Sequence, residues 1–564
     1  MPQCKQCTEQ FPITPADQAF YAKLAVPEPT LCPLCRRQRI LAWRNQRILY
    51  SRPCDATKKN IISVFAPNAP YRVYDRDYWW SDKWDPTSYG RDFDFTKTFA
   101  ENYDALLHDV PMAGIFNARS VNSAYSNHSG EMKDCYLAFA VWGSEKVLYG
   151  DLSSYDRDCA EMLETGKCNL SYEMIQTTNC YNTNYSVRSE NCSDSWFLFD
   201  CKDCSDCIGC TNLRSKQYYI FNKQYSREEY EKRKKELALD TRTGITNVRA
   251  QFETLKKQCV HRFASLTKCE NSTGDYLVGA GNTHDSFALR GETQNCAFCI
   301  NGIDKLTDTY DSYGVGASLE RAYMVLDTGV NATENIACVI AWSCQFAYYS
   351  YNCHSSFEIF GCSGLRNKKF CILNKQYEEA EYKELKARII EHMKRGGEWG
   401  EFFPPQIAPF GVNETIAQEE RPVNKEEALR LGFKWQDYSV ATRGKETLGP
   451  EAVPETIAAT GDDIVQQILA CAGCGKNYKI VKVELAFYRG KALPIPLQCP
   501  DCRYQARLAV RNPHQLWHRQ CMCVLASHET HSAGAQCLNE FETSYAPDRP
   551  EKIFCENCYQ KEVI

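Results

Sequence analysis

Residues 4–35 read CKQCTEQFPITPADQAFYAKLAVPEPTLCPLC, and residues 471–502 read CAGCGKNYKIVKVELAFYRGKALPIPLQCPDC. Both stretches carry two CxxC pairs with the same gap between them, and the match extends to 4–45 and 471–512 with 18 identical positions among 42. Similarity of this length at the two ends of one chain indicates a duplicated module. The sequence therefore predicts that both ends fold in the same way around their cysteines.

The four cysteines of each stretch have the spacing of a zinc site. Thiolates at positions i and i+3 of a tight turn present two sulfurs to one ion, and two such turns complete a tetrahedral shell. A closed shell favours structural over catalytic zinc, with redox-active thiols as the alternative. The predicted ligands are Cys4, Cys7, Cys32 and Cys35 at one end, and Cys471, Cys474, Cys499 and Cys502 at the other.

A third zinc site is expected near the C-terminus, where Cys555 and Cys558 form another CxxC pair. Its remaining ligands are Cys537 together with one of Cys521, Cys523, His528 and His531, a choice that the spacing leaves open. We favour Cys523 with Cys537, because residues 66–80 resemble 546–560 and this alignment places Cys537 at a ligand position. The expected content is about three zinc ions per chain.

The N-terminal counterpart of this third site has lost its ligands. The positions that match Cys537, Cys555 and Cys558 hold Thr57, Asp75 and Tyr78. Only Cys54 remains, so we predict a metal-free copy of the module, stabilised by its aromatic side chains.

The middle of the chain contains a second internal similarity. Residues 192–230 resemble 344–382, and both include the signature Asn-Lys-Gln-Tyr. Short apolar runs separated by Asn, Asp, Ser and Gly predict short strands. Cys135, Cys159, Cys180 and Cys201 recur at nearly equal intervals, and each interval suits one coil of a parallel β-solenoid. A β-sandwich is the alternative.

The predicted fold is mainly β with α: a parallel β-solenoid-like central region in two related halves, flanked by zinc-ribbon/treble-clef modules at both termini. The predicted domains are a zinc-ribbon/treble-clef module (1–50), a metal-free zinc-finger-like module (51–110), solenoid half 1 (111–225), a helical segment (226–258), solenoid half 2 (259–376), a helix (377–396), a Pro-rich linker with a short helix (397–460), a second zinc-ribbon/treble-clef module (461–520) and a second zinc-finger module (521–564).

One cysteine run invites a different interpretation. Cys201, Cys204, Cys207 and Cys210 follow each other at three-residue intervals, and the start of this run resembles iron–sulfur spacing. The related half keeps only the outer two, as Cys353 and Cys362. We therefore favour a ladder of small buried thiols, since free cysteine behaves as a compact apolar residue, while metal binding by the run stays open.

Arginines follow both zinc sequences and suggest a second function. Arg503, Arg507 and Arg511 lie on one face of a predicted helix, where they could contact phosphate. The alternative is a solvated face balanced by nearby acidic residues. The candidate nucleic-acid contacts are Arg36, Arg37, Arg44, Arg503, Arg507 and Arg511.

Composition narrows the class of protein. The chain has 564 residues, 32 cysteines and a formal net charge of −5, so any surface for nucleic acid must be local. There is no run of apolar residues long enough to span a membrane and no secretory leader pattern, so we expect a cytoplasmic protein with reduced thiols and no membrane partner.

Familiar catalytic motifs are missing from the sequence, and no small-molecule substrate can be identified, so we predict that the chain is not an enzyme. Solenoids can host carbohydrate chemistry on paired carboxylates, with Asp151, Asp156, Asp158, Asp308 and Asp311 as candidates.

At CPLCRRQRILAWRNQRILY, DYWWSDKWDPTSYGRDFDF, NKQYSREEY and FETSYAPDRPEKIFCENCYQ, the chain resembles large uncharacterised bacterial zinc-ribbon domain-containing proteins. The resemblance implies zinc binding at the terminal cysteine clusters and no particular activity. Together with the residues, it favours a zinc-binding interaction or scaffold protein with an unknown protein partner. A nucleic-acid-associated protein and a carbohydrate-active enzyme are the alternatives.

Overall fold

The structure is a computed structural model that describes residues 1–439, 441–525, 531–532 and 534–563. The chain divides into two compact units, each assembled from separate stretches of sequence. Unit 1 consists of residues 1–115, 264–438 and 513–516, and unit 2 of residues 116–263, 439–512 and 517–564. Each unit therefore combines the two modules of one chain end with one half of the central region, and the described part is β-rich with 12 helices.

The first module at each end contains two short helices. In unit 1 these are α1 (Pro15–Lys23) and α2 (Pro33–Leu41), and in unit 2 they are α10 (Lys482–Lys491) and α11 (Pro500–Val510). Proline occupies the first turn of α2 and of α11, where its missing N–H costs nothing, and a cysteine precedes each as the N-cap. Both pairs of helices begin at positions that correspond in the aligned sequences, as the duplication predicts.

The second modules also correspond. Unit 1 has the hairpin β1 (Tyr50–Pro53)/β2 (Asn60–Ser63), then β3 (Val73–Tyr74) and α3 (Arg76–Trp80). Unit 2 has the hairpin β32 (Trp517–Gln520)/β33 (Glu540–Thr543), then β34 (Lys552–Phe554) and α12 (Glu556–Val563). The longer connection between the strands in unit 2 accounts for the difference in length between the two sequences.

The central part of unit 2 is a ladder of short parallel strands. Residues pair with partners 12 positions further along, as in Val147 with Cys159, Met162 with Met174 and Leu198 with Cys210. Isolated bridges continue the same step from Val121 to Arg214. The strands are β9 (Glu145–Leu148), β10 (Arg157–Leu163), β11 (Tyr172–Ile175), β12 (Trp196–Phe199), β13 (Ser205–Thr211) and β14 (Gln217–Ile220).

The prediction that one coil spans the interval between successive cysteines, such as Cys159 and Cys180, is therefore wrong. Cys159 pairs with Val147, only 12 residues earlier, so one coil is shorter than that interval. The reason lies in the backbone: every third residue adopts a left-handed conformation, as at Asp158, Glu161 and Glu164. The chain turns at each of these residues, so equivalent inward positions recur every three residues. Cysteines spaced by any multiple of three can then reach the interior, and their spacing does not report the ladder step.

Unit 1 contains a larger sheet of 13 strands, which are parallel except for the last one. Its first two pairings begin at steps of 11 and 12, as in Leu266 with Leu277 and Gly274 with Ser286. The middle strands pair at a step of 13, as in Tyr310 with Tyr323, and the late strands at a step of 12, as in Gln345 with Phe357. The strands are β17 (Leu266–Thr267), β18 (Gly274–Gly281), β19 (Ser286–Gln294), β20 (Ala297–Ile303), β21 (Leu306–Tyr313), β22 (Leu319–Leu326), β23 (Ala332–Ile336), β24 (Val339–Trp342), β25 (Gln345–Tyr348), β26 (Tyr351–His354), β27 (Phe357–Phe360), β28 (Lys369–Ile372) and β29 (Lys375–Gln376).

Both ladders end in the same way, and the shared Asn-Lys-Gln-Tyr signature explains how. Asn222 accepts a hydrogen bond from the Thr211 backbone N–H and donates to the Thr211 carbonyl oxygen. Asn374 makes the same pair of bonds with Ser363. The asparagine thereby satisfies backbone groups that a following strand would otherwise bond.

A short antiparallel strand and a charged helix follow each asparagine. In unit 2 these are β15 (Lys223–Gln224) and α5 (Arg227–Glu236), followed by α6 (Arg242–Gln258). In unit 1 they are β29 and α7 (Glu379–Gly396).

The remaining elements are short, apart from one helix of 11 residues. They are η1 (Pro86–Tyr89), α4 (Phe99–Asp109), β4 (Met112–Ala113), β5 (Asn117–Ala118), β6 (Ser126–Asn127), β7 (Ser129–Gly130), β8 (Ala138–Phe139), β16 (Val260–Arg262), η2 (Pro405–Ile407), η3 (Val412–Glu414), α8 (Ala417–Glu420), α9 (Lys425–Arg430), η4 (Pro450–Ala452), η5 (Asp462–Val465), β30 (Leu469–Ala470) and β31 (Asn477–Tyr478), where η marks a 3-10 turn.

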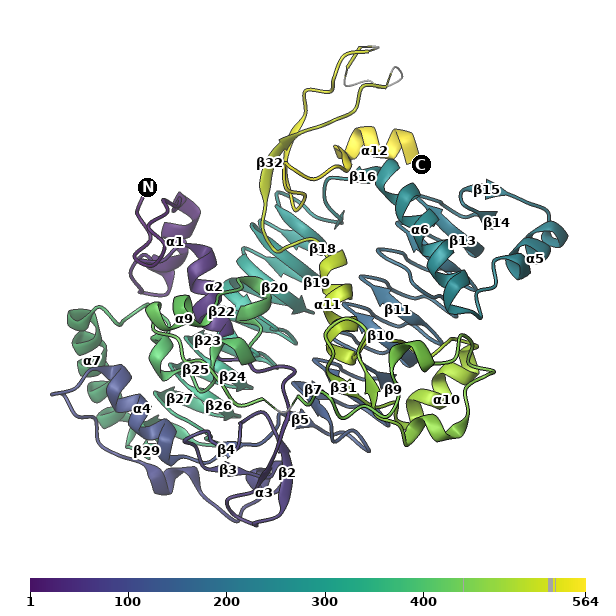
Figure 1. The fold of residues 1–564 in the computed structure, drawn as a ribbon. Coiled ribbons are helices and arrows are strands. Elements are labelled where there is room, and N and C mark those ends of the chain that lie inside the picture. Colours follow the sequence, from purple (N-terminus) through teal and green to yellow (C-terminus); the bar gives the residue numbers. More distant parts are fainter. Residues whose placement is uncertain (440, 526–530, 533, 564) are drawn as a thin grey trace. The chain divides into compact units, whose positions relative to one another are not determined.

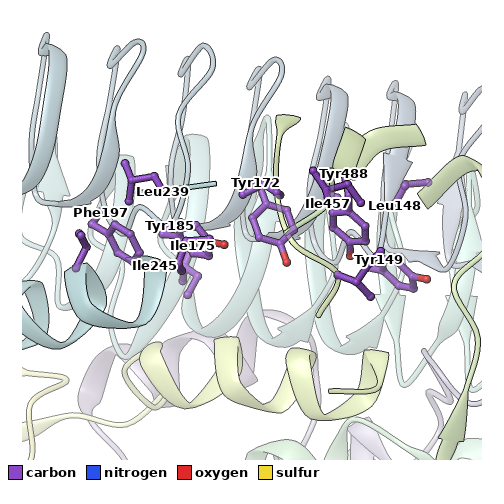
Figure 2. Packing of buried hydrophobic residues seen from close by; sticks show 14 of the residues in the cluster. Leu148, Tyr149, Tyr172, Ile175, Tyr185, Phe197, Leu239, Ile245, Ile457 and Tyr488 are labelled. Atoms are coloured by element: carbon purple, nitrogen blue, oxygen red, sulfur yellow. The ribbon is translucent and has the colours of Figure 1, made fainter. Parts of the chain in front are cut away.

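In unit 2, the outer face of the ladder forms a core with the C-terminal zinc-type module. Figure 2 shows Tyr172, Tyr185 and Phe197 in a row along successive steps of the ladder, and Tyr488 beside Tyr149. Helix α11 packs against β10 and β11 in the same unit (Figure 1). The module is therefore fixed to the ladder by a continuous apolar core.

Candidate metal centres

The first metal centre is formed by Cys4, Cys7, Cys32 and Cys35, whose sulfur atoms lie within 4.8 Å of one another. The turn after Cys4 is closed by a hydrogen bond from the Thr8 N–H to the Cys4 carbonyl oxygen. Cys32 is the N-cap of α2 and Cys35 lies in its first turn, so the positive end of the helix dipole faces two of the sulfurs. The Sγ atoms of Cys7 and Cys32 are 3.7 Å apart.

Within this centre the ionised form is favoured at Cys32 and opposed at Cys35 and Cys7, whose pKa values are raised, at Cys35 chiefly by its hydrogen bond to Cys32 and at Cys7 chiefly by burial. A hydrogen bond from the Cys35 thiol outweighs the cost of burial and lowers the pKa of Cys32 to about 5. Arg421, which directly follows α8, donates from Nη1 to Cys35 Sγ at 2.9 Å. A thiolate is the metal-binding form of cysteine, so Cys32 is a sulfur of this set at which cation binding is favoured.

The second centre, Cys471, Cys474, Cys499 and Cys502, repeats this arrangement. The Sγ atoms of Cys474 and Cys499 are 3.8 Å apart, and the Cys499 N–H donates to Cys471 Sγ at 3.2 Å. Burial opposes ionisation of Cys471, but donation from backbone N–H groups, that of Cys499 foremost, lowers its pKa to about 6.

The third centre is formed by Cys521, Cys537, Cys555 and Cys558, all of them buried. Our preference for Cys523 as the partner of Cys537 is therefore wrong, because Cys521 completes the four-sulfur group. The Cys555 N–H donates to Cys521 Sγ at 3.2 Å, the counterpart of the bond from Cys499 to Cys471 in the second centre. Of the other candidates, His531 lies beside Cys558, and His528 is outside the described residues.

A sequence signal for Cys521 was present. When the alignment that places Cys4 on Cys471 is extended, Cys54 falls on Cys521. In the N-terminal copy, the N–H groups of Thr57 and Asp75 donate to Cys54 Sγ at 3.4 and 3.2 Å, so the turn keeps its form around a single sulfur. Asp75 itself caps α3 by accepting from the Asp77 N–H.

The sulfur distances test whether zinc fits these groups. Zn–S bonds of about 2.3 Å in a tetrahedron place neighbouring sulfurs about 3.8 Å apart. The observed 3.7 and 3.8 Å agree with that edge length and are far longer than a disulfide bond of about 2.05 Å. All 32 cysteines are described, and each is a free thiol. Four thiolates in a closed shell would hold zinc and leave no coordination position for a substrate.

The run Cys201, Cys204, Cys207 and Cys210 is buried inside the ladder of unit 2. It is not among the metal-capable groups found in the described part of the chain. Each thiol donates to a backbone carbonyl oxygen two residues earlier, and burial raises the pKa of Cys201. These contacts are those of thiols packed in a protein interior, and hydrogen bonds from Cys192 and from its neighbours in the run lower the pKa of Cys204.

The C-terminal arginines form buried ion pairs with the ladder of unit 2. Glu161 on β10 lies 3.0 Å from Arg503 and also pairs with Arg507, and Glu164 pairs with Arg511 at 2.6 Å. The Arg507 and Glu161 side chains are 3% and 1% exposed. The Arg503 guanidinium also covers the ring of Tyr149 at 4.5 Å.

The N-terminal arginines repeat this contact in unit 1. Arg36 pairs with Asp311 at 2.9 Å, and Arg44 pairs with Asp327. Arg37 donates to the carbonyl oxygen of His514 at 2.6 Å. The six arginines that sequence analysis assigned to nucleic acid are therefore engaged inside the units, and their guanidinium groups are not displayed for phosphate.

The acidic residues considered for carbohydrate chemistry are also engaged. Asp311 pairs with Arg36, Asp308 with Lys23, and Asp158 with Lys146. Asp156 accepts from the Cys168 N–H and the Thr165 hydroxyl, and Asp151 is fully buried. Four of these carboxylates thus form ion pairs or hydrogen bonds within the chain, and the fifth, that of Asp151, is buried.

Comparisons with known proteins support the assignment at the N-terminus. A family model described as a probable treble clef domain matches residues 2–41, which contain the first centre. No curated protein sequence matches the chain. Among solved structures, a putative acetyltransferase from Desulfovibrio desulfuricans matches at 9% identity, covering 47% of this chain and 69% of that one, with a TM-score of 0.10. The family model alone therefore indicates a treble clef at residues 2–41.

In the described part of the chain, no helix has the length and apolar character needed to cross a membrane.

Proposed function

We propose that the protein is a zinc-binding scaffold in which three tetrathiolate sites hold the terminal modules in shape. The observation that carries this proposal is the grouping of 12 cysteines into three four-sulfur sets. The sulfur separations measured in the first two sets match the edge of a zinc tetrahedron. Bound zinc would cross-link distant stretches of the chain, and its closed shell would leave no coordination position free for catalysis.

The scaffold role is supported by how each first module meets its ladder. An aromatic pair that both modules share, Phe20-Tyr21 and Phe487-Tyr488, packs on ladder tyrosines. Phe20 stacks on Tyr310 at 3.8 Å, and Tyr488 lies 6.0 Å from Tyr172. The buried arginine pairs lie beside these rings. We infer that the modules clamp the ladders rather than present a reactive surface.

We further propose that the two ladders are β-solenoid halves related by duplication. Their parallel pairing at nearly equal steps supports this, as do the matching asparagine ends. The lack of disulfides among the described cysteines supports a reducing compartment such as the cytoplasm. We propose no enzyme activity, and the buried arginines argue against the nucleic-acid alternative.

Chelation tests the proposal on the full chain. A strong zinc chelator should release the ions and make the terminal modules susceptible to protease, while the ladders stay resistant. The protected fragments can be identified by mass spectrometry, and restoring zinc should restore resistance. Terminal modules that stay equally resistant after complete metal removal would contradict a structural role for zinc.

A further inference from the structure

One buried thiol next to the third centre has no place in the four-sulfur set. Cys523 is fully buried, yet Cys521, two residues earlier, provides the fourth sulfur. The Cys523 sulfur nevertheless lies within 4.8 Å of both Cys558 Sγ and a nitrogen of His531. Two sulfurs and one imidazole nitrogen within this distance make a second set of zinc-type donors.

The histidine is oriented as a metal ligand. Its Nδ1 lies 3.3 Å from the carbonyl oxygen of Ser532, so this nitrogen carries the proton when the contact is a hydrogen bond. The other nitrogen, Nε2, is then a lone-pair donor, and it lies 4.0 Å from Cys558 Sγ. Zinc-bound histidines commonly donate their second N–H to a carbonyl oxygen in this way, which fixes the ring.

Cys558 belongs to both sets, and this sharing is chemically reasonable. A thiolate sulfur keeps lone pairs after it binds one cation, so it can bridge two ions. The expected separation of sulfur and nitrogen ligands on one tetrahedral zinc is about 3.6 Å, close to the observed 4.0 Å.

We propose that Cys523, His531 and Cys558 bind a second divalent ion of the zinc class, and that Cys558 bridges it to the ion of the third centre. The inference rests on the proposed zinc occupancy of the Cys521, Cys537, Cys555 and Cys558 set. The chain would then hold four ions, one more than the number of four-cysteine sets. With three described protein ligands instead of four, the second ion should be the first to leave during chelation.

Native mass spectrometry of the zinc-loaded full chain tests this directly, because it counts ions per chain. The wild type should carry four ions, Cys523→Ser and His531→Ala three each, and Cys558→Ser two. Cys259→Ser is the matched control, a half-buried thiol outside every metal-capable group found among the described residues, and it should keep four.

A wild-type count of three, or an unchanged count in Cys523→Ser and His531→Ala, would overturn the second ion and leave the three tetrathiolate centres standing. A wild-type count below three would instead overturn the proposed zinc role of the quartets, and this inference with it. His531→Ala keeps the test valid if Cys523→Ser fails to fold, since His531 is only half buried.

Discussion

Substitution of Glu161 by glutamine tests how the C-terminal module is attached to its ladder. Glu161 lies on β10 with 1% of its side chain exposed, 3.0 Å from Arg503 and paired with Arg507. The substitution keeps the shape of the side chain and removes its charge. Arg503 would retain Glu484 at 3.2 Å, whereas Arg507 would lose its buried carboxylate partner.

The expected loss of stability is large because the positive charge of Arg507 stays buried after Glu161 is neutralised. Removing one partner of a buried ion pair typically costs about 3–5 kcal/mol, and the residual pairing of Arg503 with Glu484 places the expectation near the lower end, about 3 kcal/mol. The matched control is Glu131→Gln on the same ladder, whose partner Arg119 is 71% exposed. An exposed pair contributes about 0–1 kcal/mol, so this control should change little.

Hydrogen exchange followed by mass spectrometry is the suitable assay, because two units need not unfold together. A loss of about 3 kcal/mol in the opening free energy should speed exchange in peptides from α11 about a hundredfold. Peptides from α2 in unit 1 should be unaffected. If Glu161→Gln changed α11 exchange no more than Glu131→Gln does, the buried pairs would not anchor the module.

Three further predictions follow from other parts of the structure. Cys32→Ser should lose one zinc ion and make residues 1–45 sensitive to protease, as measured by metal analysis and limited proteolysis. Burial lowers the pKa of His261 from 6.5 to about 4, so between these pH values the unfolded chain binds a proton that the native chain does not. Unit 2 should therefore lose about 3 kcal/mol of stability as the pH falls from 6.5 to 4. In acid denaturation, His261→Gln should remove this pH dependence. Gly291→Ala should lower the melting temperature of unit 1, because its Cβ would overlap the Asp304 carbonyl oxygen at a positive φ of 125°, whereas Gly490→Ala in α10 has open space and should not.

Local sequence was sufficient to predict the two matched quartets, because a CxxC turn places its own two sulfurs and only two turns must meet. Local sequence was insufficient to predict the third set. There, the insertion before Cys537 separates this cysteine in sequence from Cys521 and Cys523, and both of these were possible partners for it. Comparison of Cys54 with Cys521 would have settled that choice.

The ladder step and the partners of the arginines were harder to predict, for physical reasons. Inward positions recur every three residues, so cysteine spacing could not reveal the longer step between paired strands. Arg507 pairs with Glu161, which lies far away in the sequence. The spacing of arginines is also the same on a solvated helix face and on a buried one. Only the tertiary structure distinguishes a docking face from a phosphate-binding one.

Whether zinc binds to clustered thiolates is most directly measured by X-ray absorption at the zinc edge of the purified full chain. We predict a first shell dominated by sulfur at about 2.3 Å, with at most a minor nitrogen contribution. A shell of oxygen and nitrogen at about 2.0–2.1 Å, or cysteines joined in disulfides with no bound zinc, would contradict it.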